Sequence, residues 1–396
     1  MGYYRLTDEE YVRILTVKRD LHMHPELSRK EVRTTRVIRE FLSELPDFTI
    51  LPLKAETGTG LVARVCPDQP EREILLRADI DALPQTESYE SPWKSLTPGV
   101  MHACGHDFHT AALLGAALIL QRAKNDGALR DTVDLLFQPA EEGTTGARMM
   151  IDAGLFELIR PDLCFGMHNW PSVRTGRVSC HDGPLRAGKR NFEILIYGSG
   201  GHGSMPHLNV DPIVCAAAVV QSLQTVVSRN TDPLDSVVLS ISRIEGGTPV
   251  NMVADKVTLI GTVRSLSDSA LDRAISRVEA IVQNTAGAYE CRAQIEWARR
   301  IPAVINSPGM TELAKKCALA AGCEVVDAPP SLTSEDFSLY RAHVPSYLYW
   351  VGSTAEGETV EDLHRPRFHT DDTALRYAAA LYAASVLETG DGSLSP

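Results

Sequence analysis

The sequence predicts an α/β fold in which helices flank a mostly parallel sheet and a smaller α+β domain is inserted. Short apolar runs such as Glu73–Arg77 alternate with stretches of helical spacing, which is typical of buried parallel strands with helices on both faces. Polar clusters follow directly after these runs, as expected at the carboxyl edge of such a sheet. Between residues 184 and 297 the apolar residues alternate instead, which indicates a separate unit with antiparallel strands.

The elements of the first domain follow from the period of its apolar residues. Residues 8–45 predict one or two helices, with the turn His24-Pro25-Glu26 as the separation, and residues 110–124 predict a further helix. The expected strands are nearly continuous apolar runs, so we expect them to be buried on both faces. They are residues 60–65, 73–77, 132–137 and 162–167.

The chain length of 396 residues favours more than one domain. Strands are expected in the inserted domain at residues 191–197, 236–242 and 256–263, with helices at 210–229 and 267–286. A last helix is expected at residues 373–387. The predicted domains are residues 1–183 for the first part of a catalytic domain, 184–297 for the inserted domain and 298–396 for the second part of the catalytic domain.

Composition and charge limit the partners that we expect. A net charge of −12 argues against nucleic acid and against an anionic membrane surface. The longest apolar run, Ala111–Leu120, has half the roughly 20 residues that a membrane span needs. Eight cysteines lack paired spacing and no export signal is evident, so we expect free thiols in a cytoplasmic protein.

The stretch from His102 to His109 concentrates three histidines, a cysteine and an aspartate in eight residues. Cys104 and His106 stand two apart around a glycine, and we expect this pair to bind a metal ion. His102 and His109 are expected to have structural or supporting roles. Asp107 is left with three alternatives, namely binding metal, capping the following helix or orienting an imidazole. A thiolate with imidazoles favours Zn²⁺, Mn²⁺, Co²⁺ or Ni²⁺ over Ca²⁺ or Mg²⁺.

Two adjacent carboxylates, Glu141 and Glu142, follow a buried strand and a proline. A solvated acidic turn is the simpler interpretation, but purely surface-exposed glutamates are less expected directly after a buried strand and a proline. Adjacent side chains point in different directions, so one carboxylate can bind metal while the other accepts a proton from water.

Further histidines could complete a metal site. His168 follows the buried run 162–167, and His364 and His369 offer another ligand late in the chain. The residues themselves barely distinguish His364 from His369.

Other catalytic motifs receive little support. Gly198–Gly203 matches Gly-x-Gly-x-x-Gly formally, but no helix follows at once and no acidic residue stands about 20 residues further on, so we reject dinucleotide binding. Its glycines instead present His202. The chain lacks the Gly-x-Ser-x-Gly motif of serine hydrolases and the His-Glu-x-x-His motif of zincins.

Together these motifs resemble the dinuclear-metal amidohydrolases, which include N-acyl-amino-acid amidohydrolases, hippurate hydrolases and auxin-conjugate hydrolases, relatives of aminoacylase and carboxypeptidase G. The matching segments run in family order over nearly the whole chain. They are Leu21–Ser28, Arg77–Pro84, His102–Asp107, Gln138–Gly143, Gly200–His207, Asp211–Pro212, Ser334–Phe337 and Leu363–His364.

The resemblance implies a metal-dependent hydrolase of linear amide bonds that cleaves N-acyl-L-amino acids. It implies two divalent ions per subunit (Mn, Zn, Co or Ni), with Glu141 as general base and Asp79 as an aspartate that orients a metal-site group. The implied metal ligands are Cys104, His106, Glu142, His168 and His364.

The resemblance also implies that the inserted domain is a lid that carries the contact of a homodimer, with a tetramer as the alternative. Its His202 would polarise the scissile carbonyl in the partner's site, while Asn251, Arg264 and His207 would contact the substrate. Two alternatives stay open, namely a dipeptidase or carboxypeptidase on the same scaffold and a non-catalytic relative that binds metal or ligand.

Overall fold

The computed structural model describes residues 4–389 and divides into two compact units. The first comprises the chain up to Gly183, the segment Ile305–Pro329 and the chain from Leu339 onward, and the second comprises Pro184–Val304 and Pro330–Ser338. The second unit extends beyond residue 297. It also takes in Pro330–Ser338, which was expected in the catalytic domain, because the Arg186 guanidinium pairs with Glu335 at 3.0 Å and Ala187 N–H donates to Thr333 O at 2.8 Å.

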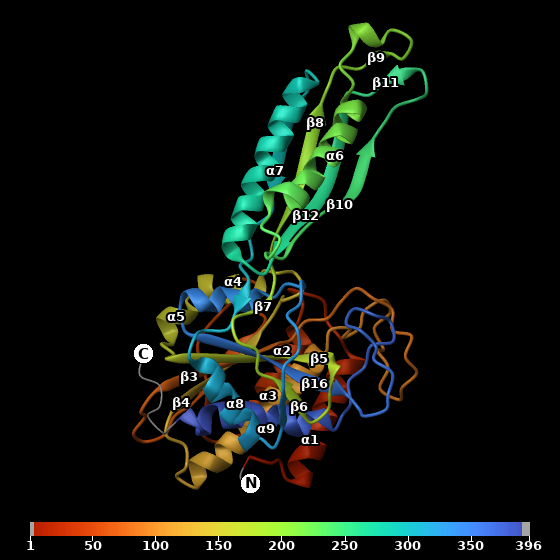
Figure 1. Cartoon of the computed structure of the whole chain (residues 1–396). Coiled ribbons are helices and arrows are strands. Elements are labelled where there is room, and N and C mark those ends of the chain that lie inside the picture. The colour runs from red at the N-terminus through yellow and green to blue at the C-terminus, as the bar shows by residue number, and fades with distance from the viewer. Residues whose placement is uncertain (1–3, 390–396) are drawn as a thin grey trace. The chain divides into compact units, whose positions relative to one another are not determined.

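An eight-stranded sheet forms the centre of the first unit, in the order β1-β2-β4-β3-β5-β16-β6-β15 (Figure 1). Its four central neighbours β4, β3, β5 and β16 are parallel, whereas β1, β2 and β4 pair antiparallel, as do β16 and β6. The expected mostly parallel sheet is therefore confirmed. The strands are β1 (Phe48–Ile50), β2 (Leu61–Val65), β3 (Glu73–Asp79), β4 (Thr132–Gln138), β5 (Leu163–Arg174), β6 (Arg177–Ser179), β15 (Glu324–Val326) and β16 (Ser346–Thr354).

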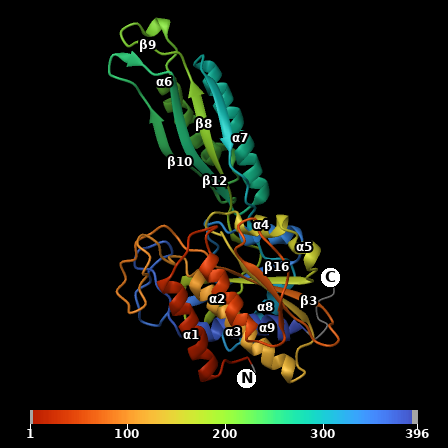
Figure 2. The ribbon, with the colours of Figure 1, turned by 180° about the vertical axis from the view of Figure 1, so that it is seen from behind.

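Helices pack against this sheet through one continuous apolar core. Alternate residues of the central strands, such as Leu76 of β3 and Phe165 of β5, join the core, so its helices cover one face of the sheet. Helix α3 packs closely against α1 and α9 (Figure 2). Gly115 of α3 allows this approach, since a Cβ there would lie 2.8 Å from Ala379 of α9 and 3.0 Å from Ile14 of α1. The helices are α1 (Asp8–Met23), α2 (Val32–Ser43), α3 (His106–Asn125), α4 (Gly146–Asp152), α5 (Leu155–Leu158), α8 (Met310–Ala320) and α9 (Ala374–Leu387), with the 3-10 helix η2 (Asp336–Ala342).

The second unit is an antiparallel sheet, in the order β10-β12-β8-β13, with two helices packed on it. A short ribbon of β9 and β11 stands at one end of this unit (Figure 1). The elements are β7 (Pro184–Arg186), β8 (Gly188–Tyr197), β9 (Gly201–His202), η1 (Pro206–Leu208), α6 (Pro212–Asn230), β10 (Val237–Gly246), β11 (Met252–Val253), β12 (Lys256–Ser265), α7 (Asp268–Ala288), β13 (Arg292–Trp297) and β14 (Val304–Ile305).

Within residues 4–389, α6 is the one helix whose length and composition would allow it to cross a membrane. Its buried residues, which include Cys215, Val219 and Leu223, recur at helical spacing and pack in the apolar core of the second unit. This one-sided burial is the pattern of a core helix.

Candidate metal centre

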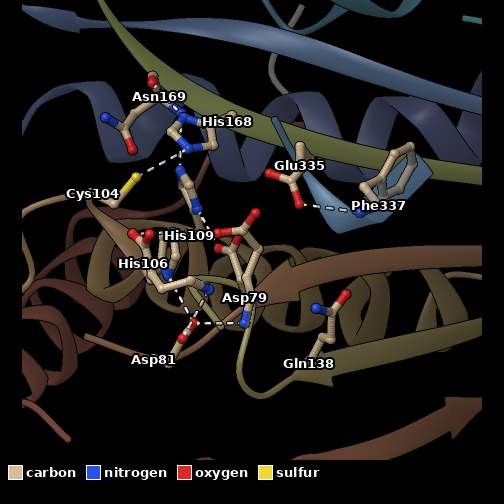
Figure 3. Close-up of polar contacts among 12 residues, drawn as sticks. Asp79, Asp81, Cys104, His106, His109, Gln138, His168, Asn169, Glu335 and Phe337 are labelled. Carbon is tan, nitrogen blue, oxygen red and sulfur yellow. Dashed lines mark hydrogen bonds and ion pairs between the residues drawn. The ribbon is translucent and has the colours of Figure 1, made fainter. Parts of the chain in front are cut away.

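The side chains of the candidate site gather around the carboxyl ends of the central strands of the first unit (Figure 3). Asp79 ends β3, Glu141 and Glu142 follow β4, and His106 begins α3. His168 differs from the expectation. It lies inside β5 rather than beyond it, because β5 continues beside β16 as far as Arg174.

Unusual backbone angles shape the loops that carry these side chains. Gly105, between Cys104 and His106, has φ +85°, and a Cβ there would lie 2.3 Å from the Asn169 side-chain oxygen. Ala140 precedes Glu141 with φ 55°, and His364 itself has φ 60°. Residues other than glycine rarely adopt this left-handed region, and they do so mostly where surrounding structure enforces it, often at functional sites.

The five predicted metal ligands lie together. In each of three overlapping groups, every residue has one ligand atom within 4.8 Å of those of the others. Cys104 Sγ lies 3.4 Å from His168 Nε2, and Glu142 Oε1 lies 3.3 Å from His364 Nε2. The groups are Cys104, His106 and His168; Cys104, Glu142 and His364; and His106, Glu141 and Glu142.

Asp81 connects three parts of this site, although the sequence analysis assigned it no role. Its Oδ1 accepts from His106 Nδ1 and from the backbone N–H of Glu141, each at 3.1 Å. Its Oδ2 accepts from the Glu142 N–H at 3.1 Å and from the Ser28 hydroxyl at 2.6 Å. The two-residue spacing from Asp79 at a strand end places both carboxylates on one side, which is the signal that could have found Asp81.

Asp79, the predicted orienting residue, is fully buried. Its Oδ2 lies 3.6 Å from His106 Nε2 and accepts a hydrogen bond from Arg77 at 2.8 Å, while its Oδ1 bonds His109 Nδ1. Burial by itself raises the pKa of this carboxyl, but His106 and the Arg77 guanidinium outweigh it and hold the pKa well below its usual value. Asp79 is therefore a carboxylate that contacts two histidines of the site.

The donor atoms suit a borderline transition metal. Among residues 4–389, buried His106 Nε2 has no hydrogen-bond partner, as expected of an atom that faces a cation. Burial, reinforced by the charge of Glu142, raises the pKa of the Cys104 thiol well above its usual value. A coordinated cation opposes this effect, since a thiol that binds metal loses its proton. A thiolate, imidazoles and carboxylates therefore fit Zn²⁺, Mn²⁺, Co²⁺ or Ni²⁺.

The other histidines of the motif lie outside these groups of predicted ligands. His369 stacks on Tyr89 at 4.0 Å, and its Nδ1 donates to Arg367 O at 3.0 Å. Asp107, for which three roles were open, accepts a hydrogen bond from His22 Nδ1 at 2.9 Å. His102 is buried, and neither of its ring nitrogens has a hydrogen-bond partner among the described residues.

The predicted substrate residues belong to the second unit. His202 and Asn251 are exposed neighbours, since Met252 pairs with His202 and Gly203 N–H donates to Asn251 O at 2.8 Å. His207 is exposed in η1 nearby. Arg264 is distant from all three, at the opposite end of β12 from the β9–β11 ribbon, and donates to Leu332 O at 3.0 Å. The second unit therefore does not bring Arg264 together with the other predicted contacts.

Known proteins resemble this chain over nearly its full length. The model of peptidase family M20/M25/M40 matches residues 75–388. An N-acetylcysteine deacetylase from Bacillus subtilis (strain 168) is 37% identical over 382 residues, which cover 96% of this chain and 98% of that protein. An IAA-amino acid hydrolase from Arabidopsis thaliana is 36% identical over 375 residues, which cover 93% of this chain and 83% of that protein.

A solved structure has the same fold. It is a dinuclear metal-binding peptidase of the M20 family from Bacillus subtilis, with a TM-score of 0.84 and 34% identity. The alignment covers 96% of this chain and 98% of that one.

Proposed function

Since the chain belongs to peptidase family M20/M25/M40, we propose that it is a metal-dependent amidohydrolase that converts N-acyl-L-amino acids into a carboxylic acid and a free amino acid. The observation that carries this proposal is the convergence of five metal-binding side chains beside the buried carboxylate of Glu141. Relatives named as a deacetylase of an N-acetyl amino acid and as a hydrolase of IAA-amino acids support the substrate class.

Two divalent ions, of Mn, Zn, Co or Ni, would be held by Cys104, His106, Glu142, His168 and His364. Cys104, His106 and Glu142 each belong to two of the three groups of ligand atoms, so each would lie close to several of the other ligands. When bound, such ions lower the pKa of water at the site and polarise the scissile carbonyl.

Glu141 is the proposed general base. The residue is 5% exposed, and the hydrogen bond from its backbone N–H to Asp81 holds the loop. The backbone N–H of the neighbouring Glu142 also donates to Asp81, and the Glu142 side chain contacts His364. One carboxylate can therefore bind metal while Glu141 takes a proton from the attacking water and delivers it to the departing amine.

His202 is proposed to stabilise the oxyanion. Its Nδ1 lies 3.2 Å from the Ser204 backbone N–H, which can only donate, so Nδ1 is an acceptor and the neutral ring carries its proton on Nε2. The Nε2–H group is then available to donate to a substrate oxygen. In other hydrolases, the loss of one such donor raises the activation barrier by about 3 kcal/mol. Asn251, His207 and Arg264 are proposed substrate contacts.

We propose that the second unit carries the contact of a homodimer, with a tetramer as the alternative, and that His202 acts in the partner's site. Exposed apolar side chains around the β9–β11 ribbon and α6 support an interface there. They include Met205, Leu208, Ile213, Val214, Val250 and Met252. Mixed dimers of His202→Ala and Glu141→Ala chains should regain activity that neither variant has alone. Well-exchanged mixtures without activity would assign His202 to its own chain's site. A cytoplasmic location stays a prediction.

The proposed reaction is tested with acetyl, benzoyl, indole-acetyl and long-chain acyl amino acids, each with Mn²⁺, Zn²⁺, Co²⁺ or Ni²⁺, and with dipeptides as the comparison. Release of the free amino acid from at least one acyl compound supports the proposal. Cleavage of dipeptides alone would identify a peptidase, and binding without any turnover would identify a non-catalytic relative.

A further inference from the structure

We infer that His109 is a positioning residue that holds His168 toward the metal centre through the backbone of Asn169. This inference rests on the proposed function, because His168 is one of the assigned metal ligands. His109 lies on α3, one turn after His106, whereas His168 and Asn169 lie on β5.

The peptide groups on both sides of Asn169 are engaged. Its backbone N–H donates to His109 Nε2 at 2.9 Å, and its carbonyl accepts from His168 Nδ1 at 2.7 Å (Figure 3). With Nδ1 engaged, the other ring nitrogen of His168 lies 3.4 Å from Cys104 Sγ. His109 therefore holds the backbone N–H of the residue whose carbonyl sets the direction of the His168 ring.

The protonation state of His109 follows from these contacts. A backbone N–H can only donate, so Nε2 of His109 must be an acceptor without a proton. The proton of the neutral ring is then on Nδ1, where it bonds Asp79 Oδ1. Both ring nitrogens are engaged, so His109 is not itself a metal ligand, although it has a ligand atom within 4.8 Å of those of His106 and Asp79.

Arg77 in turn holds Asp79 in place. Arg77 Nη1 donates to Asp79 Oδ2 and Arg77 Nε donates to Gln138 Oε1, both at 2.8 Å. The Tyr340 hydroxyl donates to the same Gln138 oxygen at 2.9 Å. Arg77, Asp79, Gln138 and His109 are each 0% exposed, so this series of hydrogen bonds joins β3, β4, α3 and β5 in the interior. Such a buried and satisfied network is rigid.

Two reciprocal substitutions separate the two contacts of His109. In His109→Gln the side-chain oxygen can still accept from Asn169 N–H, while the bond to Asp79 is lost. In His109→Asn the amide can still donate to Asp79, while the contact with Asn169 is lost. His102→Gln is the matched control, because His102 is also buried, lies in the loop just before α3, and has a side chain that makes no hydrogen bond within residues 4–389.

The test measures metal affinity by calorimetry on folded, metal-free protein, with circular dichroism to establish folding. We expect His109→Asn to weaken binding about 10–100-fold, the usual effect of removing a group that orients a metal ligand. His109→Gln should weaken it less, and His102→Gln should bind as the wild type does. Equal affinities of wild type and His109→Asn, or a greater loss in His109→Gln, would overturn the inference.

A second measurement needs no metal. Nitrogen-15 NMR of wild-type protein labelled at histidine should show the His109 ring as a neutral ring protonated at Nδ1, and the signals that are lost in folded His109→Gln assign it. A proton on Nε2 of His109 would overturn the inference. A wild-type chain that binds metal but cleaves no acyl amino acid would contradict the proposed function and leave this inference standing.

Discussion

Asp81 accepts a hydrogen bond from the backbone N–H of Glu141 at 3.1 Å and so ties the end of the central strand β3 to the loop that carries the proposed general base. The same carboxylate orients His106, so one side chain positions both the base and a metal ligand.

Replacing Asp81 should therefore impair catalysis and stability together. In Asp81→Ala, the buried N–H of Glu141 and the part-buried N–H of Glu142 lose their acceptor, which costs about 1–3 kcal/mol for the buried group, and His106 loses its orienting partner. We expect the free energy of unfolding to fall and kcat to drop about 10–100-fold. Asp81→Asn, which keeps one oxygen, should be milder in both. Wild-type kcat in Asp81→Ala would show that the loop is held by other contacts.

Glu141 and Cys104 should separate catalysis from metal binding. Glu141→Gln keeps the size of the side chain but cannot accept a proton, so we expect normal metal content with a kcat lower by about 10²–10⁴-fold. Cys104→Ala should lose both metal and activity, because Cys104 belongs to two groups of ligand atoms. Metal analysis and initial rates on the same samples make this comparison. Undiminished turnover by Glu141→Gln would end its assignment as the base.

Gly105→Ala should damage the metal loop more than a comparable glycine change elsewhere. Gly105 and Gly127 both have positive φ, at +85° and +68°, so alanine costs about 1–2 kcal/mol at either position. Only at Gly105 would the added Cβ meet a neighbour, at 2.3 Å from Asn169 Oδ1, whereas nothing lies within 4 Å at Gly127. We expect Gly105→Ala to unfold at lower denaturant concentration than Gly127→Ala and to bind less metal. Equal behaviour of the two variants would refute this packing argument.

His22 should make stability depend on pH. Burial opposes its protonation, but hydrogen bonds and charges from Asp107 and Glu87 raise the pKa of His22 from 6.5 to about 9. Because the pKa is higher in the folded state, the stabilisation is complete below pH 6.5 and disappears as the pH rises to about 9.

Unfolding of metal-free wild type and His22→Gln tests this dependence. The wild type should be more stable by roughly 3 kcal/mol near pH 6, and the difference should shrink toward pH 10. A difference that does not change over this range would contradict a protonated His22.

Sequence patterns predicted the parts of the site that depend on local spacing. Cys104 and His106 stand two apart, and Glu141 and Glu142 follow a strand, so their types and positions made them candidates before any contact was known. The roles of Asp81 and His109 could not be predicted in this way. Asp81 acts through backbone N–H groups of a loop after another strand, and His109 through the backbone of Asn169, about 60 residues along the chain.

In the fold as well, the pairing of segments that are far apart in the chain could not be predicted from sequence patterns. The extension of β5 past His168 depends on its pairing with β16, a buried strand that the apolar pattern had not assigned. The position of Pro330–Ser338 in the second unit depends on contacts such as Arg186 with Glu335. Each of these features requires a partner far away in the sequence.

The most direct test of the central claim is the rate of N-acyl amino acid hydrolysis by chelated protein as a divalent metal ion is titrated back. We predict that the chelated chain is inactive, that activity returns as two ions bind per chain, and that no metal restores Cys104→Ala. A chelated, metal-free chain that hydrolyses the substrate at the original rate would contradict the account.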